Sequence, residues 1–145
     1  AARGLDGAVT CYDPGENVHR SGILHTTAVP ATLKPGQHMD AVLLAGRILN
    51  ALDYVGVLTL EFFATREGPV FNEMAPRVHN SGHWTIEGAA TSQFENHIRA
   101  ITGLPLGATA TRTFCERERQ LARVDVPVAR EVRSAENTVC RHRWK

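Results

Sequence analysis

The stretch of sequence that decides the fold runs from residue 55 to residue 74 and reads VGVLTLEFFATREGPVFNEM. Residues 55–64 show the branched and aromatic side chains of a strong β-strand, and residues 69–74 form a second such run. The segment between them, Arg66-Glu67-Gly68, is typical of a hairpin turn. The sequence therefore predicts an antiparallel hairpin whose turn centres on Glu67.

A turn centred at this position determines which residues face each other. Glu61 is expected opposite Glu73, and Phe63 opposite Phe71, while Glu67 in the turn is expected in solvent. Cβ atoms of directly opposite residues lie about 4.5–5.5 Å apart, so two carboxylates there repel unless a cation lies between them. Oxygen ligands suit Mg²⁺, which commonly takes one or two carboxylates together with phosphate oxygens. The pair predicts a Mg²⁺–nucleotide site. The alternatives are a shifted register, or one glutamate turned to solvent at a sheet edge.

The loop directly after the hairpin is dense in polar groups. Arg77 offers a planar fork of donors that fits bicarbonate or phosphate, and His79, Asn80 and Ser81 add neutral polar groups. Beside a dicarboxylate site, this composition indicates the anion pocket of a phosphoryl-transfer centre. The alternative is a hydrophilic connector whose side chains cap helix ends. Trp84 is interpreted as a packing anchor.

The rest of the first 107 residues predicts a mixed fold. The expected elements are strands at residues 8–12 and 22–29, a turn at 13–15, and helices at 37–52 and 92–102. A capping box starts the second helix, glycine and proline end it, and apolar residues at helical spacing form its expected buried stripe: Ser92 with Glu95, Gly103 and Pro105, and Phe94, Ile98 and Ile101. We expect an α+β fold, an antiparallel sheet that carries the hairpin, with both helices packed on one face.

Length and composition exclude several classes of protein. The chain has 145 residues, 43% of them hydrophobic and 21% charged, which fits one globular domain with a core. No apolar run or leader pattern indicates a membrane span or a secretory signal, and a net charge of +1 gives no reason to expect a nucleic-acid partner. Three widely spaced cysteines fit neither a disulfide framework nor a CxxC metal site, so a reducing cytoplasm is expected.

The charge divides the chain into two unequal parts. Residues 1–107 carry a net charge of −3, and residues 108–145 carry +4 with only scattered apolar positions. A weak helix is predicted over residues 114–124, within an otherwise irregular and solvated tail. The alternative, an RNA-binding tail, is disfavoured because no aromatic residues are interleaved among the arginines.

Several segments of the first part together resemble one enzyme family. They read ENVHRSGIL at residues 16–24, GVLTLEFF at 56–63, NEMAPRVHNSGHWT at 72–85, TSQFENHIRA at 91–100 and LPLG at 104–107. This pattern is similar to the 5-(carboxyamino)imidazole ribonucleotide synthases, a branch of the ATP-grasp superfamily that is also described as the ATPase subunit of phosphoribosylaminoimidazole carboxylase. The resemblance covers about residues 1–107, the C-terminal half of the ATP-grasp domain, and its 72–85 segment is long and specific.

The resemblance implies a carbon–nitrogen ligase that joins ATP, bicarbonate and 5-aminoimidazole ribonucleotide in purine biosynthesis through carboxyphosphate. It implies that Mg²⁺ is held against the ATP phosphates by Glu61 and Glu73. It further implies an ATP site that includes Asn72 and Glu73, with nucleotide contact by His19. The bicarbonate and carboxyphosphate pocket would be lined by Arg77, His79, Asn80 and Ser81. Full-length members of the family are commonly homodimers, with no nucleic-acid or membrane partner.

Some features depart from the family pattern. Ala75 stands where many ATP-grasp relatives have a third metal ligand, Asn, while Asp13 and Ser21 replace a common Pro and Asp. The family has further N-terminal and C-terminal domains and a lobe whose lysines grip ATP, whereas this sequence contains only Lys34 and Lys145.

These departures lead us to expect an isolated chain that is inactive or nearly so. Residues 108–145 are interpreted as a divergent or out-of-frame end, which sequencing of the encoding DNA would test. Two other functions stay open: an ATP-grasp ligase or carboxylase with another acceptor, and a non-catalytic fragment that needs a partner chain.

Overall fold

The computed structural model describes residues 1–112 and 140–143. The elements of this part are strands and helices in the order β1 (Ala2–Arg3), β2 (Val9–Thr10), β3 (Glu16–Arg20), β4 (Ile23–Val29), α1 (Pro35–Ala51), β5 (Gly56–Val57), β6 (Thr59–Thr65), β7 (Gly68–Ala75), η1 (Asn80–Gly82), α2 (Thr85–Gly88), α3 (Gln93–Ile101) and β8 (Cys140–Arg143). All strand pairs are antiparallel, so the predicted α+β class is confirmed.

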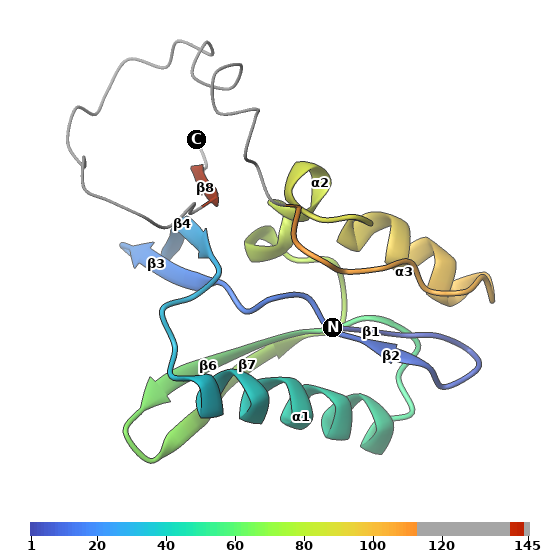
Figure 1. Ribbon diagram of the computed structural model, residues 1–145, viewed down its shortest axis with the longest axis horizontal. Coiled ribbons are helices and arrows are strands. Elements are labelled where there is room, and N and C mark those ends of the chain that lie inside the picture. The colour runs from blue at the N-terminus through green and yellow to red at the C-terminus, as the bar shows by residue number, and fades with distance from the viewer. Residues whose placement is uncertain (113–139, 144–145) are drawn as a thin grey trace, which may run out of the picture.

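The strands form three small sheets instead of the expected single one. Their orders are β2-β1-β5, β3-β4-β8 and β6-β7. The predicted strand at 55–64 is divided at Leu58, which is fully buried and donates its backbone N–H to the Ala1 carbonyl. The helices also pack separately, since α1 contacts β7 while α3 contacts β1 and β5 (Figure 1). The hairpin therefore packs against α1 and is not covered by both helices.

Strand β3 and its turn were not predicted from the sequence. Residues 13–15, where a turn was expected, lie outside any regular element and lead directly into β3. The reversal occurs instead at Ser21 and Gly22, whose φ angles are +52° and +76°. Positive φ at both turn residues is the geometry that twists two strands into a tight hairpin. Apart from Val18, β3 has no apolar residue, so its sequence carried little strand signal.

Helix α1 forms where the apolar period predicted a helix. It begins at Pro35, a residue suited to the first helical position because it lacks an N–H. The Gln37 amide accepts from the Lys34 backbone N–H (3.2 Å) and donates to the Thr65 carbonyl (2.6 Å). The start of α1 is thus tied to the end of the hairpin strand β6.

Helix α3 lies where it was predicted, but its buried face is different. Ser92 caps the helix by accepting from the Glu95 backbone N–H (3.2 Å), as the capping box predicted. The expected apolar stripe was wrong, because Phe94, Ile98 and Ile101 are 36%, 55% and 47% exposed. The buried residues are Gln93, Asn96 and Ala100. The helix faces its neighbours with hydrogen-bonding groups, which a search for apolar periodicity misses.

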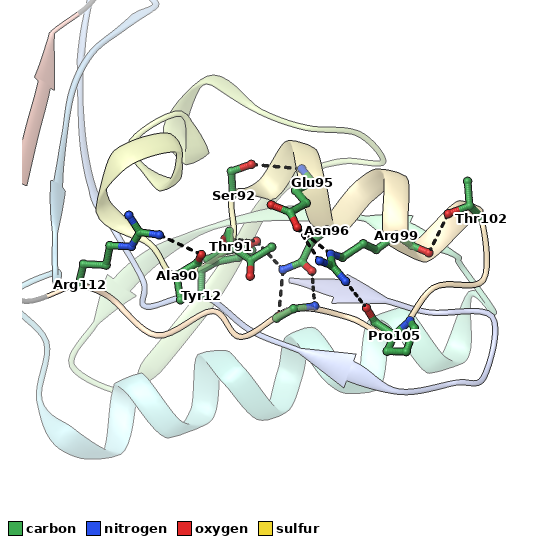
Figure 2. A network of polar contacts seen from close by, with 11 residues as sticks. Tyr12, Ala90, Thr91, Ser92, Glu95, Asn96, Arg99, Thr102, Pro105 and Arg112 are labelled. Atoms are coloured by element: carbon green, nitrogen blue, oxygen red, sulfur yellow. Dashed lines mark hydrogen bonds and ion pairs between the residues drawn. The ribbon is translucent and has the colours of Figure 1, made fainter.

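Asn96 is the centre of the polar network that fixes α3 (Figure 2). Its side chain is fully buried, donates to the Tyr12 hydroxyl (2.7 Å) and the Gly107 carbonyl (3.2 Å), and accepts from the Gly107 N–H (2.8 Å). Tyr12 in turn donates to the Thr91 carbonyl (3.0 Å) and packs edge-on against Trp84. Trp84 is 4% exposed in a core cluster, which confirms its interpretation as a packing anchor.

The environment of Tyr12 predicts a loss of stability at alkaline pH. Burial raises the pKa of Tyr12 from 10.0 to about 12, against a smaller lowering by its hydrogen bond from Asn96. Between these values the unfolded chain releases a proton that the folded chain keeps, so stability is complete below pH 10 and falls as the pH rises toward 12. Urea unfolding at pH 9, 10 and 11 measures the decline. Because burial also raises the pKa of Tyr54, both Tyr12→Phe and Tyr54→Phe are compared, and the larger part should vanish with Tyr12→Phe.

The chain stays ordered for several residues beyond Gly107. Ala90 and Arg112 donate backbone N–H groups to the Ala110 and Gly88 carbonyls, and Ala89 forms a bridge with Thr111. Within the tail that was expected to be irregular, β8 pairs with β4. The helix predicted over residues 114–124 lies outside the described residues, and the boundary at residue 107 stays a prediction.

None of the helices described here has the length and apolar character that crossing a bilayer requires.

Candidate metal and anion site

The hairpin places Glu61 directly opposite Glu73, as predicted, but by a different route. The turn consists of Arg66 and Glu67, and a bulge between Glu61 and Phe62 leaves Asn72 as an extra residue on β7. The observed turn is one residue shorter than predicted, which shifts the strand pairing by one residue. The extra residue at the bulge shifts the pairing back, so the two glutamates still face each other. Nearer the turn the predicted register was wrong by one residue, so that Phe71 faces Phe62 and not Phe63. The ring centroids of Phe62 and Phe71 are 6.2 Å apart in an edge-on arrangement.

His79 joins the two carboxylates. One ligand atom from each of Glu61, Glu73 and His79 lies within 4.8 Å of the others. The ion pairs Arg3–Asp53, His38–Asp13 and Arg99–Glu95 include neither of these two glutamates. Two facing carboxylates are oxygen donors that suit a divalent cation, and the imidazole lies next to them. The residues present therefore fit the predicted metal. Glu73 faces Glu61 but is itself exposed, so the alternative of a glutamate open to solvent also stays a prediction.

Asn17 holds Glu61 from the neighbouring sheet. Its amide donates to Glu61 Oε1 (3.1 Å), and its carbonyl oxygen accepts from the Thr27 hydroxyl (2.9 Å). Asn17 and Thr27 face each other on β3 and β4, and Thr27 is 1% exposed. Because Thr27 occupies the amide oxygen, the NH₂ group must point toward the carboxylate. The hydrogen-bond chain thus sets the orientation of Glu61 before any ligand is present.

The hydrogen bonds of the His79 ring select one tautomer. The Ser81 backbone N–H donates to Nδ1 (3.3 Å), and the Ser81 hydroxyl lies 2.9 Å from the same nitrogen. Since Nδ1 accepts, the neutral ring carries its proton on Nε2. Burial lowers the pKa of His79 below its usual 6.5, with Glu61 and Glu73 raising it and Arg77 and His19 lowering it to a smaller extent. His79 is therefore neutral at pH 7.

A cavity of about 510 Å³ opens beside Glu61 and Ser81, although neither Glu73 nor His79 is among its lining residues. Its lining includes three residues that the sequence assigned to the nucleotide or metal, His19, Asn72 and Glu61, together with Ser81 of the loop. These residues come from β3, from β6 and β7, and from η1, so two sheets and a 3₁₀ turn contribute to the lining. Apolar side chains of α1, such as Val42, form part of the wall. The cavity has the mixed apolar and polar character of a small-molecule site.

Two predicted anion-pocket residues lie apart from this cluster. Arg77 is exposed and donates Nη1 to the Val78 carbonyl (3.0 Å). Asn80 is exposed at the start of η1. The loop after the hairpin therefore combines both interpretations: His79 and Ser81 turn toward the carboxylates, whereas Arg77 and Asn80 face outward.

Sequence reasoning missed the residues that support the site. Asn17 and Thr27 hold Glu61, and Gln93 forms hydrogen bonds with the His79 backbone. Gln93 directly follows the recognised cap Ser92, but helix capping gave no reason to look at its side chain. Asn17 and His19 are two residues apart, so they lie on the same face of β3. This spacing could have indicated Asn17 as a site residue, but only if β3 had been recognised as a strand.

Asn17→Ala is expected to weaken Mn²⁺ binding by about tenfold, since partners of metal-holding side chains typically contribute 10- to 100-fold. The carboxylates remain in this variant, but Glu61 loses the donor that orients it. Titration calorimetry with Mn²⁺ measures the effect. Asn50→Ala is the matched control, because Asn50 accepts a hydrogen bond from Arg3 and does not line the cavity. Equal affinities of the two variants would contradict the orienting role.

The described fold and site define an ATP-grasp protein. The ATP-grasp domain model matches residues 1–94, about two thirds of the sequence, and the chain belongs to this family. Its relatives include the N5-carboxyaminoimidazole ribonucleotide synthase of Brucella melitensis, 53% identical over 119 residues that cover 81% of this chain and 33% of the relative. The same enzyme of Pseudomonas aeruginosa is 53% identical over 112 residues, covering 76% and 30%.

Solved structures agree with these relatives. The N5-carboxyaminoimidazole ribonucleotide synthetase of Thermus thermophilus has a TM-score of 0.74 and 58% identity, and the match covers 77% of this chain and 31% of that one. The N5-carboxyaminoimidazole synthase of Aspergillus clavatus, solved in complex with ADP and 5-aminoimidazole ribonucleotide, has a TM-score of 0.70 and 36% identity, covering 74% and 29%. The chain thus spans about a third of the length of the relatives it matches.

Proposed function

We propose that this chain provides the metal-binding and anion-binding part of an N5-carboxyaminoimidazole ribonucleotide synthase. The reaction is the carboxylation of 5-aminoimidazole ribonucleotide with ATP and bicarbonate, through carboxyphosphate. The observation that carries the proposal is the cluster of Glu61, Glu73 and His79, whose ligand atoms lie within 4.8 Å of one another. It is supported by relatives of that name at about half identity, 53% in Brucella melitensis.

Glu61 and Glu73 hold Mg²⁺ in this proposal. When bound, the ion supplies positive charge that offsets the negative charge of the ATP phosphates. Asn72 and Glu73 belong to the ATP site, and His19 contacts the nucleotide from β3. This assignment is supported by the shared cavity that Glu61, Asn72 and His19 line.

His79, Ser81, Arg77 and Asn80 receive the bicarbonate and the carboxyphosphate. Neutral His79 offers its Nε2 proton to an anionic oxygen, and Ser81 lines the cavity that Glu61 also lines. Arg77 and Asn80 stay in the proposal because they flank His79 in one loop, and the charge of Arg77 contributes to lowering the pKa of His79. Carboxyphosphate is short-lived in water, so these groups must act in a site that excludes solvent.

The proposal includes the setting of the reaction. We place the protein in the cytoplasm, where purine biosynthesis takes place, with small molecules as its ligands and with neither nucleic acid nor membrane as a partner. The complete enzyme is proposed to be a homodimer.

A chimera tests the proposed function. Residues 1–107 replace the matching segment of the Brucella melitensis synthase, and consumption of 5-aminoimidazole ribonucleotide is measured with ATP, Mg²⁺ and bicarbonate. We expect activity within about tenfold of the parent enzyme, consistent with catalytic groups held in their productive geometry. Activity should be lost when Glu73→Gln is added. A folded chimera that binds ATP but does not turn over 5-aminoimidazole ribonucleotide would favour another acceptor.

A second candidate, a non-catalytic chain that folds against a partner chain, is favoured by one specific observation. Large apolar side chains are exposed on the hairpin and on α3, among them Phe63 (60%), Val70 (51%) and Ile98 (55%). Contiguous exposed apolar surface usually marks an interface. Light scattering of the isolated chain distinguishes the two candidates: a monodisperse monomer whose melting temperature rises with Mg²⁺–ATP supports the first, and association without any such rise supports the second.

A further inference from the structure

Gln93 makes an unusual pair of hydrogen bonds with one residue of the anion loop. The His79 backbone N–H donates to Gln93 Oε1 (3.0 Å), and Gln93 Nε2 donates to the His79 carbonyl (2.7 Å). A side-chain amide thus satisfies both backbone groups of His79, as a neighbouring strand would. Gln93 is 2% exposed. Burying an amide costs free energy unless it forms hydrogen bonds, and these two bonds offset that cost.

The other end of the loop is fixed through the same residue. The Gln93 backbone N–H donates to Thr85 Oγ1 (2.9 Å), and the Thr85 hydroxyl donates to the Gly82 carbonyl (2.6 Å). Gly82 lies so close to the amide that a Cβ built on it would be 2.4 Å from Gln93 Oε1. A side chain at this position would force the Gln93 amide to move, and the turn His79–Gly82 is held at both ends by buried groups.

From these contacts we propose that Gln93 is the positioning residue of the anion loop, holding the His79 ring at the Glu61–Glu73 pair. The inference rests on the proposed function of these three residues. Gln93 is not a catalytic residue, because it contacts the backbone of His79 and not its ring. Gln93 fixes the backbone of His79, which is extended (φ −132°, ψ 153°). The His79 ring is then oriented by accepting a hydrogen bond from the Ser81 N–H.

The chemistry of the amide explains why glutamine is needed. One donor and one acceptor on the same group match the C=O and N–H of His79. In Gln93→Glu the ionised carboxylate still accepts from the N–H, but it faces the His79 carbonyl with a second acceptor. In Gln93→Met the length is kept and both hydrogen bonds are lost. Both variants should release the loop without shortening the side chain at this position.

Paramagnetic broadening by Mn²⁺ tests the proposal on the full chain. Mn²⁺ bound between the carboxylates broadens NMR signals of nearby protons, and the effect falls steeply with distance. With isotope-labelled histidine, we expect the His79 ring signals of the unmodified chain to vanish at substoichiometric Mn²⁺, with Mg²⁺ as the diamagnetic control. In Gln93→Met and Gln93→Glu, Mn²⁺ should still bind, while the His79 ring signals persist. Ser92→Ala is the matched control, because it removes the cap of α3 without touching the loop.

Amide exchange provides a second measurement that needs no metal. Loss of the hydrogen bond to Gln93 should raise the exchange rate of the His79 amide by about tenfold or more in both Gln93 variants, and not in Ser92→Ala. Broadening of His79 that is unchanged in the Gln93 variants would overturn the proposal. If Mn²⁺ broadens no ring even in the unmodified chain, the metal assignment fails by itself. The exchange result then decides the role of Gln93, and an unchanged rate would overturn it.

Discussion

Glu73→Gln is expected to stabilise the metal-free chain while abolishing its response to Mg²⁺ and Mn²⁺. The two effects have opposite signs because the same pair of charges is responsible for both. Without a cation, Glu61 and Glu73 face each other directly, and removing one like charge from such a pair gains about 0.5 kcal/mol. With a cation, the same substitution deletes one of two carboxylate ligands, and we expect affinity to fall by about 100-fold or more.

The measurement is thermal unfolding with and without Mn²⁺ at a concentration of about 100 times the dissociation constant, where binding stabilises the native chain by about 2.7 kcal/mol. The unmodified chain should show this stabilisation, and Glu73→Gln and Glu61→Gln should not. Glu67→Gln is the charge-matched control, because Glu67 is exposed in the turn of the same hairpin. A variant at Glu73 that is both less stable without metal and equally stabilised by Mn²⁺ would refute the site.

The hairpin shows how far sequence reasoning reached and where it stopped. Two strands with a charged turn predicted the pairing of Glu61 with Glu73, because strand periodicity and turn position together determine which residues are opposite. The bulge at Asn72 was not predictable, since it depends on how β7 is accommodated by the whole fold. The glutamates met because two errors of one residue cancelled, while Phe63 and Phe71, on the turn side of the bulge, did not meet.

Polar packing accounts for the other differences. Apolar periodicity placed Phe94, Ile98 and Ile101 in the core, yet the buried face of α3 consists of Gln93, Asn96 and Ala100. Hydrogen bonds between distant segments carry no local sequence signal, because their partners are known only once the chain is folded. The same reason hid Asn17, whose role depends on Glu61, a residue 44 positions away. Motif and spacing named the candidate ligand residues, whereas the residues that contact them in the folded chain could not be named in this way.

Asn96→Ala is expected to destabilise the chain by about 3 kcal/mol, because it leaves several buried polar groups without partners. The Gly107 N–H and carbonyl lose their hydrogen bonds, and the Tyr12 hydroxyl loses its donor. Asn96 is completely buried, so water does not replace these bonds without a rearrangement. Urea unfolding at pH 7 measures the loss. Glu95→Ala, one residue earlier, removes the exposed ion pair with Arg99 and should cost about 0.5 kcal/mol.

The network also predicts that Asn96 and Tyr12 act together. Their side chains are joined by a 2.7 Å hydrogen bond, so the cost of Asn96→Ala should be smaller in a Tyr12→Phe background, with a coupling of about 1 kcal/mol. Because α3 begins with Gln93 and is fixed by Asn96, loss of this network should loosen the anion loop as well. Faster amide exchange at His79 in Asn96→Ala would support this link. If the stability losses of Asn96→Ala and Tyr12→Phe simply add, and the amide exchange rate of His79 does not change, then α3 keeps its position without Asn96.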